Sequence, residues 1–584
     1  MITLGINAAF HDSAAALVRD GELVAAAEEE RFTRVKHAKR PVPFSAWELP
    51  FNAIDYCLRE AGTTLGEVDH VGYSFDPARF ARDRFSDGEA RLPIDPAAPV
   101  PATWESPWDP LFACYVRQAP HQLVDGVPHH LTQRIRGARH DGPFRFHFLD
   151  HHLCHQASAF LDAPFERCAV MTLDGRGEHA TTTYGRWHDG RYEGLGEVCM
   201  PHSLGMLYER MTAHLGFLHS SDEYKVMALA ALGRPVMAER FLELIDVRPD
   251  GSYAVAEFDP TRLFGPARAR GEPLHQAHFD LTASLQRALE KTVLQLAAIL
   301  RERSGERCLA MAGGVALNCV MNAKLRDAGL FDEIWVQPAA GDAGTALGAA
   351  LWLDHRERGG MDGTPPPRAW TMKHAYWGPG FTDDEIEAVM KWAKLRYRPL
   401  RDVAGETARL LAQDRIVGWF QGRMEFGPRA LGARSILASP ISQDMQARLN
   451  ELKDREDFRP VAPALPRDDL ADWFVPAAAN RGEAPFMLFL YDVRPEQATR
   501  IPAVCHADRT ARVQTVTRES APRFHDTLKA FQALTGVPIL VNTSFNVRGE
   551  PIVCTPQDAL HAFFSTPLDA LVIGRFLVEK RCHG

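Results

Sequence analysis

The chain has 584 residues, about four times the ~150 residues expected of one domain, so several domains are expected. Hydrophobic residues make up 46% and charged residues 24%, which excludes a largely disordered or collagen-like chain. Lysine and arginine total 66 against 75 aspartates and glutamates, and the net charge of −9 excludes a uniformly basic nucleic-acid-binding surface.

Cysteine usage indicates a reducing compartment. The ten cysteines are scattered, with no CxxC spacing, which is typical of buried thiols rather than of a disulfide framework. The first residues, MITLGINAAFHDS, lack the basic and apolar regions of a signal peptide, and no uncharged apolar stretch of ~18 residues occurs. We therefore expect a cytoplasmic protein that does not enter a membrane.

The N-terminal part contains a weak internal repeat of a strand, a polar turn and a hairpin. Strand 2–6 leads to a hairpin centred on Asp20-Gly21, and strand 169–173 leads to a hairpin centred on Asp189-Gly190. Both dipeptides are typical of two-residue type I′ turns. The hairpin strands are expected at 14–18, 22–27, 181–187 and 192–198. The repeat predicts two related α/β lobes.

A long helix and a glycine turn follow the second copy. Apolar residues recur at spacings of three and four over residues 278–304, which predicts an amphipathic helix. Strand 308–312 then runs into Gly313-Gly314, where paired glycines would let the backbone approach a nucleotide. The charged, glycine- and proline-rich residues 355–368 mark the expected domain boundary.

The segment 150–155 (DHHLCH) offers metal ligands. If it is helical, His151 and His155 lie on one face at i and i+4 and can share a metal. Chance is the alternative, because the chain has 24 histidines. Asp342 favours the metal, since a carboxylate in an apolar, glycine-flanked turn is costly without a partner. Two imidazoles and one carboxylate form the facial triad typical of Fe(II), with Zn(II) or Mn(II) as alternatives.

A second polar cluster, Asn7, His11, Asp12 and Ser13, follows the first strand. A capped turn explains Asp12 or Ser13 but not His11, which could act as a general base toward an acceptor hydroxyl. Lys36 belongs to the charged segment 28–37, which is either a solvated face or the border of a cleft.

The C-terminal part places arginines in glycine-rich turns. Residues 421–435 (QGRMEFGPRALGARS) hold Arg423, Arg429 and Arg434 at an expected strand–helix junction, which suits phosphate or carboxylate binding. Further cations in 450–459 are either part of this site or in salt bridges with neighbouring acids. The expected strand 539–541 runs into NTSFN at 542–546, a natural place to hold a nucleotide or small anion.

Eight segments, taken together, resemble the O-carbamoyltransferases of the NodU/CmcH family, a group that includes antibiotic-tailoring enzymes. In chain order they are GINAAFHDSAAALVRDGELVAAAEEERFTRVKH, DHHLCHQASAF, LDGRGE, AGGVALNCVMN, GDAGTALGAA, GRMEFGPRALGARSIL, LKDREDFRPVAP and NTSFNVRGEPIV. They span nearly the whole chain. One departure is CHAD at 505–508, where relatives tend to have threonine followed by His-Val-Asp.

The resemblance implies an α/β fold in two parts. Residues 1–365 are expected to form a duplicated, actin-like transfer domain that bears the metal, and residues 366–584 a YrdC-like domain. In such proteins the YrdC-like site uses carbamoyl phosphate and ATP, with Mg, to make carbamoyladenylate. The adenylate passes to the actin-like site, where a hydroxyl of a small molecule, a natural product or sugar, attacks the carbamoyl carbon. The resemblance implies a role in antibiotic biosynthesis and allows for a homodimer. The net charge of −9 argues against a nucleic acid partner.

The resemblance also assigns residues. His151, His155 and Asp342 match the iron ligands, and His11 matches the catalytic histidine, with Lys36 nearby. Gly313, Gly314 and Asn318 match the nucleotide-binding turn, while the carbamoyl phosphate and ATP site is matched by Arg429, Lys453, Arg459, Arg512, Ser544 and Asn546. Four further residues of the polar turns and arginine-rich segments are candidate cofactor contacts: Asn7, Asp174, Arg423 and Asn542.

Two other functions remain open. A tRNA threonylcarbamoyl transferase would share both domains, although the charge of −9 and the lack of a long basic stripe disfavour it. An actin-like ATP-dependent kinase or chaperone would need no HxxxH metal pair. The acceptor is not identified, and residues 89–149 are expected to shape its pocket.

Overall fold

The computed structural model describes residues 1–38, 49–81, 112–113, 116–126, 142–359, 364–477, 479 and 483–580. Two compact units are distinguished. The first comprises residues 1–203, 310–315 and 339–371, and the second comprises 204–309, 316–338 and 372–584. Residues 89–149 are predicted to shape the acceptor pocket, and of these 89–111, 114–115 and 127–141 lie outside the described residues.

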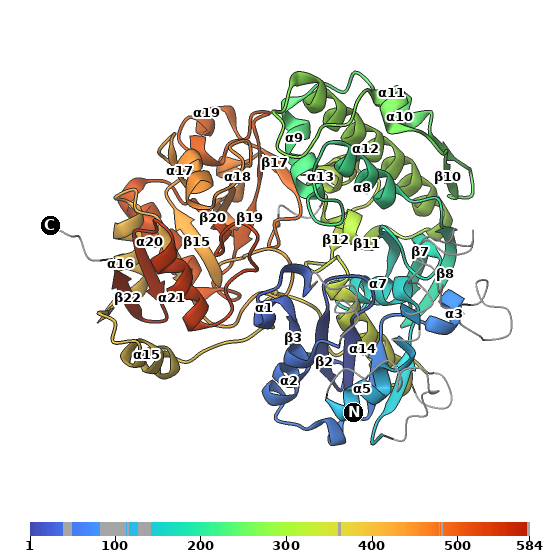
Figure 1. Cartoon of the computed structure of the whole chain (residues 1–584), viewed down its shortest axis with the longest axis horizontal. Helices are drawn as coiled ribbons and strands as arrows, with labels where there is room; N and C mark the ends of the chain where they lie inside the picture. The colour runs from blue at the N-terminus through green and yellow to red at the C-terminus, as the bar shows by residue number, and fades with distance from the viewer. Residues whose placement is uncertain are drawn as a thin grey trace. The chain divides into compact units, whose positions relative to one another are not determined.

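Two five-stranded sheets have the same strand order, and Figure 1 labels β2 and β3 of the first and β7, β8, β11 and β12 of the second. The first has the order β3-β2-β1-β4-β5, with β1 at Ile2–Asn7, β2 at Ala14–Arg19, β3 at Glu22–Glu28, β4 at His70–Tyr73 and β5 at Arg145–Phe148. The second has the order β8-β7-β6-β11-β12, with β6 at Cys168–Leu173, β7 at Ala180–His188, β8 at Arg191–Cys199, β11 at Cys308–Ala312 and β12 at Glu333–Val336. The predicted duplication is confirmed.

The two hairpins form where their turn dipeptides stand. Asp20 and Gly21 have φ angles of 52° and 89°, and Asp189 and Gly190 have φ angles of 50° and 71°. Positive φ at both central residues defines the type I′ turn, whose twist matches that of the flanking strands. The antiparallel pairs β1–β2–β3 and β6–β7–β8 follow from these turns.

Helices α7 (His151–Phe160) and α14 (Ala343–Arg358) pack closely in the first unit. A Cβ atom at Gly348 would lie 1.8 Å from the carbonyl oxygen of Cys154, so only glycine fits between the helices. On the β1 side, a Cβ atom at Gly5 would lie 1.9 Å from the carbonyl oxygen of Ala346. Backbone contact on both sides fixes the start of α14 relative to α7 and β1.

The second unit contains the long helix α12 (Gln276–Ser304), which confirms the prediction for 278–304. It begins two residues earlier than predicted and ends at Gly305, whose φ is 70°. It packs against α9 (Glu223–Leu229), α10 (Ala238–Leu242) and α13 (Cys319–Asp327), and Tyr208 of α8 (Leu204–His214) donates to Gln286 of α12 at 3.2 Å. Among the described residues, no helix has both the length and the apolar character needed to cross a bilayer.

An eight-stranded mixed sheet forms the C-terminal part of the second unit. Its strands in spatial order are β13 (Arg398–Pro399), β22 (Phe576–Glu579), β21 (Ala570–Ile573), β14 (Val417–Phe420), β15 (Arg434–Ala438), β20 (Leu540–Ser544), β16 (Ala462–Pro466) and β19 (Gln514–Val516). Helices of this part include α16 (Val403–Leu411), α17 (Met445–Leu452), α20 (Pro522–Thr535) and α21 (Pro556–Ser565). A separate pair joins β17 (Leu490–Asp492) to β18 (Thr510–Arg512). The predicted α/β class is confirmed.

Two local predictions are wrong. The arginine-rich segment 421–433 does not join a strand to a helix but connects the antiparallel strands β14 and β15. The strand predicted at 539–541 continues to Ser544, because Asn542, Thr543 and Ser544 pair with Leu437, Ile436 and Ser435 of β15. The polar side chains of 542–544 led us to expect a turn there. A strand can nevertheless continue through polar residues, because the neighbouring strand satisfies its backbone hydrogen bonds. The boundary at 365/366 stays a prediction.

Candidate functional site

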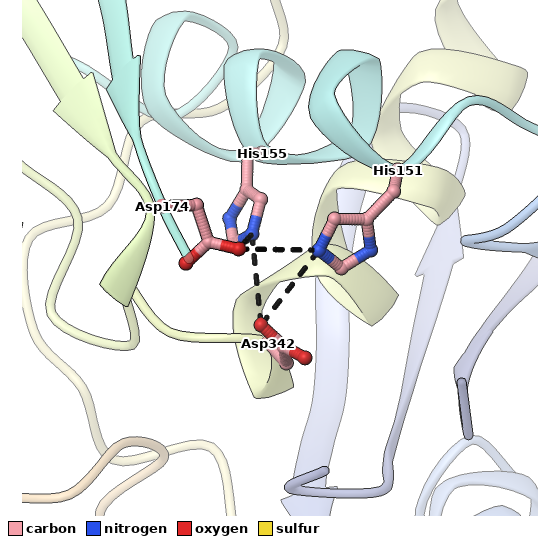
Figure 2. Close-up of side chains that lie close together, drawn as sticks. All are labelled: His151, His155, Asp174 and Asp342. Carbon is pink, nitrogen blue, oxygen red and sulfur yellow. Dashed lines mark ion pairs between the residues drawn. The ribbon is translucent and has the colours of Figure 1, made fainter. Parts of the chain in front are cut away.

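Two histidines and two aspartates converge in the first unit (Figure 2). His151 and His155 project from one face of α7, as their spacing predicts. Each Nε2 atom lies 3.7 to 3.8 Å from Asp174 Oδ2 and from Asp342 Oδ1. Asp174 follows β6 and Asp342 precedes α14, so three segments distant in sequence supply the four side chains.

Neighbouring groups fix the orientation of α7. Asp150 caps the helix by accepting from the backbone N–H of Leu153 at 2.8 Å, and Glu178 accepts from the N–H of His151 at 3.0 Å. The His151 Nδ1 atom lies 3.1 Å from the carbonyl oxygen of Ser74. This bond requires a hydrogen on Nδ1 and turns the Nε2 side of the ring toward the aspartates.

The four side chains fit a divalent transition metal. All are buried, and among the described residues the Nε2 atoms of His151 and His155 form no hydrogen bond. Buried polar atoms without partners are rare in native proteins, and a metal would satisfy both. Two imidazole nitrogens and two carboxylate oxygens suit Fe(II), Mn(II) or Zn(II). The predicted triad is thus brought together and joined by Asp174.

The pKa values of residues in the histidine–aspartate group are shifted from their usual ranges. Burial acts to lower the pKa of His151, but Asp174 and Asp342 outweigh it and raise that pKa to about 9. Burial, helped by neighbouring His151, holds the pKa of His155 well below its usual range. Burial also raises the pKa of Asp342. These opposing shifts arise because charges of both signs are confined together away from water.

His11 lies at the edge of this group. Its Nε2 atom is 3.9 Å from Asp342 Oδ2, and its Nδ1 atom is 2.9 Å from Asp12 Oδ2. Asn7, predicted to contact a cofactor, is buried and donates to the carbonyl oxygens of His11 at 2.9 Å and of Asp12 at 3.1 Å. Asn7 therefore shapes the turn that carries His11. Lys36 lies in the one-turn helix η1 (Lys36–Ala38), next to His37.

The predicted nucleotide-binding turn has the expected backbone. Gly313 has a φ of 96°, and a Cβ atom there would lie 2.2 Å from the carbonyl oxygen of Leu173. The N–H of Gly314 donates to Asp174 Oδ1 at 2.7 Å, which joins the turn to the histidine–aspartate group. Asn318 instead caps α13, accepting from the N–H of Met321 at 3.0 Å and pairing with Gln286. Its side chain is committed to the helix start.

Five cations converge in the second unit. They are Arg429, Lys453, Arg455, Arg459 and Arg512, and we call them the cationic cluster. Burial and Arg512 lower the pKa of Arg429 to about 9, while burial together with Arg455 and Arg459 holds the pKa of Lys453 well below its usual range. Among the described residues, Arg429 Nε, Arg455 Nη2 and Arg512 Nε are buried without a hydrogen bond. Repelling cations with unused donors indicate an anion site.

Two predicted polar residues join the cluster. The Lys453 Nζ atom donates to Ser544 Oγ and to Asn546 Oδ1, each at 2.9 Å. Ser544 ends β20, and Lys453 follows α17, so a strand end and a helix end meet. Helix α9 contributes Tyr224, whose ring lies 4.7 Å below the Arg459 guanidinium, and Lys225, which pairs with Glu456 at 3.0 Å.

Other residues of the arginine-rich segments have structural partners. Arg423 donates to the carbonyl oxygens of Trp377 at 2.6 Å and of Gly378 at 3.2 Å. Arg434 is fully buried and donates to several carbonyl oxygens, including those of Gln421 and Pro379. Asn542 donates to Gln514 Oε1 at 2.7 Å inside the sheet. These three side chains are therefore committed to contacts within the fold.

Sequence reasoning missed two members of these groups. It placed Asp174 with a nucleotide rather than with the histidines, and it did not select Arg455, which lies two residues beyond Lys453. The only sequence signal for Asp174 was a carboxylate directly after a buried strand in a copy of the repeat. Arg455 had the signal of its charged neighbours, but Glu456 and Asp457 beside it favoured a surface ion pair.

A further group, His70, His147 and Glu357, has donor atoms within 4.8 Å of one another. The Arg356 guanidinium lies 3.2 Å from His147 Nδ1 and 2.7 Å from Glu357. Because Arg356 already places a positive charge among these donors, a metal cation there would be repelled. The group is a hydrogen-bonded network that includes the Arg356–Glu357 ion pair.

Two family profiles cover most of the chain. The profile described as Carbamoyltransferase N-terminus matches residues 2–351, and the one described as Carbamoyltransferase C-terminus matches residues 408–580. The chain belongs to the carbamoyltransferase family. The predicted family and enzyme class are therefore confirmed, and this carbamoyltransferase contains the histidine–aspartate group and the cationic cluster in separate family regions.

Relatives extend over almost the full length of this carbamoyltransferase. An uncharacterized protein of Synechocystis sp. is 40% identical over 99% of this chain and 96% of its own. Nodulation protein NolNO of Sinorhizobium fredii is 38% identical over 98% of this chain and 80% of its own, and Nodulation protein U of Rhizobium tropici is 31% identical over 92% and 90%. Among solved structures, a ROK hexokinase from Thermus thermophilus is 16% identical over 61% of this chain and all of its own, with a TM-score of 0.30.

Proposed function

We propose that this carbamoyltransferase makes carbamoyladenylate from carbamoyl phosphate and ATP and transfers the carbamoyl group to a hydroxyl of a small molecule. The cationic cluster supports the first step. Five converging cations, three of which have a buried N–H group without a hydrogen bond among the described residues, suit a ligand bearing several negative charges, such as MgATP together with carbamoyl phosphate. In that step water cleaves carbamoyl phosphate to carbamate and phosphate. A carbamate oxygen then attacks the α-phosphorus of ATP and displaces pyrophosphate.

The histidine–aspartate group and His11 support the second step. The acceptor hydroxyl attacks the carbamoyl carbon, a C–O bond forms, AMP leaves, and His11 Nε2 takes the hydroxyl proton. His151, His155, Asp174 and Asp342 would hold the metal, and a bound Fe(II), Zn(II) or Mn(II) supplies positive charge for the anionic adenylate. AMP is a good leaving group, so positioning and deprotonation are the main demands on the protein.

The two-step assignment predicts separable defects. Lys453→Ala removes a cluster charge, so pyrophosphate release should fall on the order of 10²–10³-fold, equivalent to ~2–4 kcal/mol of transition-state stabilisation. His155→Ala removes a metal ligand, so metal content and carbamoyl transfer should be lost while pyrophosphate release persists. Both are measured with isotope-labelled carbamoyl phosphate, ATP and a panel of sugars and aminoglycosides, with mass spectrometry of the panel and metal analysis.

A rescue assay with chemically supplied carbamoyladenylate distinguishes the two steps. It should restore labelled product to Lys453→Ala but not to His155→Ala. Melting temperatures establish that each variant is folded. Failure of rescue in folded Lys453→Ala would refute the two-site division, and full transfer by metal-free His155→Ala would refute the metal role.

A further inference from the structure

We propose that Asp12 and His37 are positioning residues for the transfer step, which hold His11 in one tautomer and one orientation through a shared carboxylate. The inference rests on the proposed function of His11 as the base. Asp12 Oδ2 lies 2.9 Å from His11 Nδ1, and Asp12 Oδ1 lies 2.7 Å from His37 Nδ1. One carboxylate thus contacts two imidazoles, one with each oxygen.

The shared carboxylate determines where each histidine carries its hydrogen. An ionised carboxylate accepts hydrogen bonds and donates none, so both Nδ1 atoms must be the protonated ones. In neutral His11 the lone pair is then on Nε2, the atom that lies 3.9 Å from Asp342 Oδ2. Asp12 therefore presents the basic nitrogen of His11 toward the histidine–aspartate group.

The backbone conformation and hydrogen bonds around His11, Asp12 and His37 support this contact. Asp12 and His37 have φ angles of 50° and 61°, in the left-handed region that is unfavourable for residues other than glycine. The Asn7 side chain holds the carbonyl oxygens of the His11–Asp12 turn, and Glu30 accepts from the N–H of His37 at 2.6 Å. The N–H of Asp12 donates to the carbonyl oxygen of His37 at 3.3 Å, which joins the two turns.

The second imidazole has a distinct consequence for the reaction. A carboxylate bound by one ring can rotate about its Cβ–Cγ bond, whereas a bond at each oxygen holds its plane and the His11 ring plane with it. The side chains of His11, Asp12 and His37 are 29%, 26% and 26% exposed, so a substrate can approach His11. When Nε2 takes the hydroxyl proton, Asp12 also stabilises the imidazolium that forms.

The test uses the full chain, supplied carbamoyladenylate and the acceptor identified by the labelled-carbamoyl panel. His37→Leu removes the second donor and should lower kcat about 10- to 100-fold with little change in KM. His37→Asn should restore most of that loss, because its amide nitrogen can occupy the Nδ1 position. Asp12→Asn should lower kcat by about 10² or more. His188→Leu is the matched control, since His188 contacts Asp189 at 3.3 Å in the distant β7–β8 hairpin.

Double variants separate positioning from general structural damage. In a His11→Asn background, Asp12→Asn and His37→Leu should cause no further loss of kcat, since the base on which they act is absent. Losses that multiply in full, or wild-type kcat in folded His37→Leu, would overturn the inference. Wild-type transfer by His11→Asn would instead refute the proposed role of His11. Melting temperatures show which variants are folded.

Discussion

Arg429 and Arg434 lie five residues apart in one glycine-rich segment, and their surroundings differ. Arg429 faces Arg512 and has a buried Nε atom with no hydrogen bond among the described residues. Arg434 begins β15 and donates to carbonyl oxygens of Gln421, Gly422 and Pro379. A guanidinium surrounded by carbonyls stabilises the fold, whereas one surrounded by cations is available to an anion.

Replacing either arginine by methionine removes one positive charge, but we expect one variant to lose activity and the other to lose stability. Arg429→Met should lower pyrophosphate release on the order of 10²–10³-fold with the melting temperature unchanged or higher, because a repelled cation is removed. Arg434→Met should lower the free energy of unfolding by about 3–5 kcal/mol, because several buried carbonyls lose a charged donor. Thermal denaturation and pyrophosphate release measure both variants. A stable Arg434→Met, or an unfolded Arg429→Met, would contradict the assignment.

At the scale of elements, the approach of α7 and α14 sets the geometry of the histidine–aspartate group. Gly348 lies where the helices meet, near the start of α14, while His151 and His155 occupy the first turns of α7. A change in the separation of α7 and α14 must move the two histidines relative to Asp342, because the histidines lie on α7 and Asp342 directly precedes α14.

Gly348→Val is therefore expected to disrupt the metal group. The new side chain would overlap the carbonyl of Cys154, and overpacking of this kind costs about 1–3 kcal/mol or more. Metal content measured by mass spectrometry should fall together with carbamoyl transfer. Gly194→Val on β8 is the control, since a Cβ atom there meets nothing within 4 Å. Full metal occupancy in Gly348→Val would show that helix spacing does not set the site.

For the whole molecule, we expect the cationic cluster to link stability to anion binding. Burial and mutual repulsion lower the pKa values of Arg429, Lys453, Arg455 and Arg512, which means that folding opposes their charge. For a base whose pKa is lowered by folding, the destabilisation is full below the folded pKa and vanishes above the unfolded one. Near neutral pH the ligand-free protein therefore bears this cost, and a bound anion offsets it.

Pyrophosphate should accordingly stabilise the folded chain. At about 100 times its Kd it would add ~2.7 kcal/mol to the free energy of unfolding, visible as a higher melting temperature. Sodium chloride at equal ionic strength is the control, and Arg429→Met should respond less than wild type. An equal shift with sodium chloride would mean that the effect is general screening rather than a site.

The sequence by itself determined the elements that depend on neighbours along the chain. The two hairpins follow from Asp20-Gly21 and Asp189-Gly190, and α12 follows from its apolar periodicity, because turn conformation and helical faces are local properties. The HxxxH pair is similarly local, since i and i+4 share a face on any helix. The residue pattern also singled out His11 and the cations of 450–459, and the family resemblance assigned their roles, including those of His11 and Lys453.

Only the tertiary structure decided which polar side chains meet. Asp174 joins His151 and His155 because the repeated sheets place the end of β6 beside α7, and Asp12 lies between His11 and His37 because two turns are hydrogen-bonded together. The different environments of Arg429 and Arg434 were equally hidden. These contacts join residues far apart in the chain, and their energies depend on burial and on partners that no local pattern specifies.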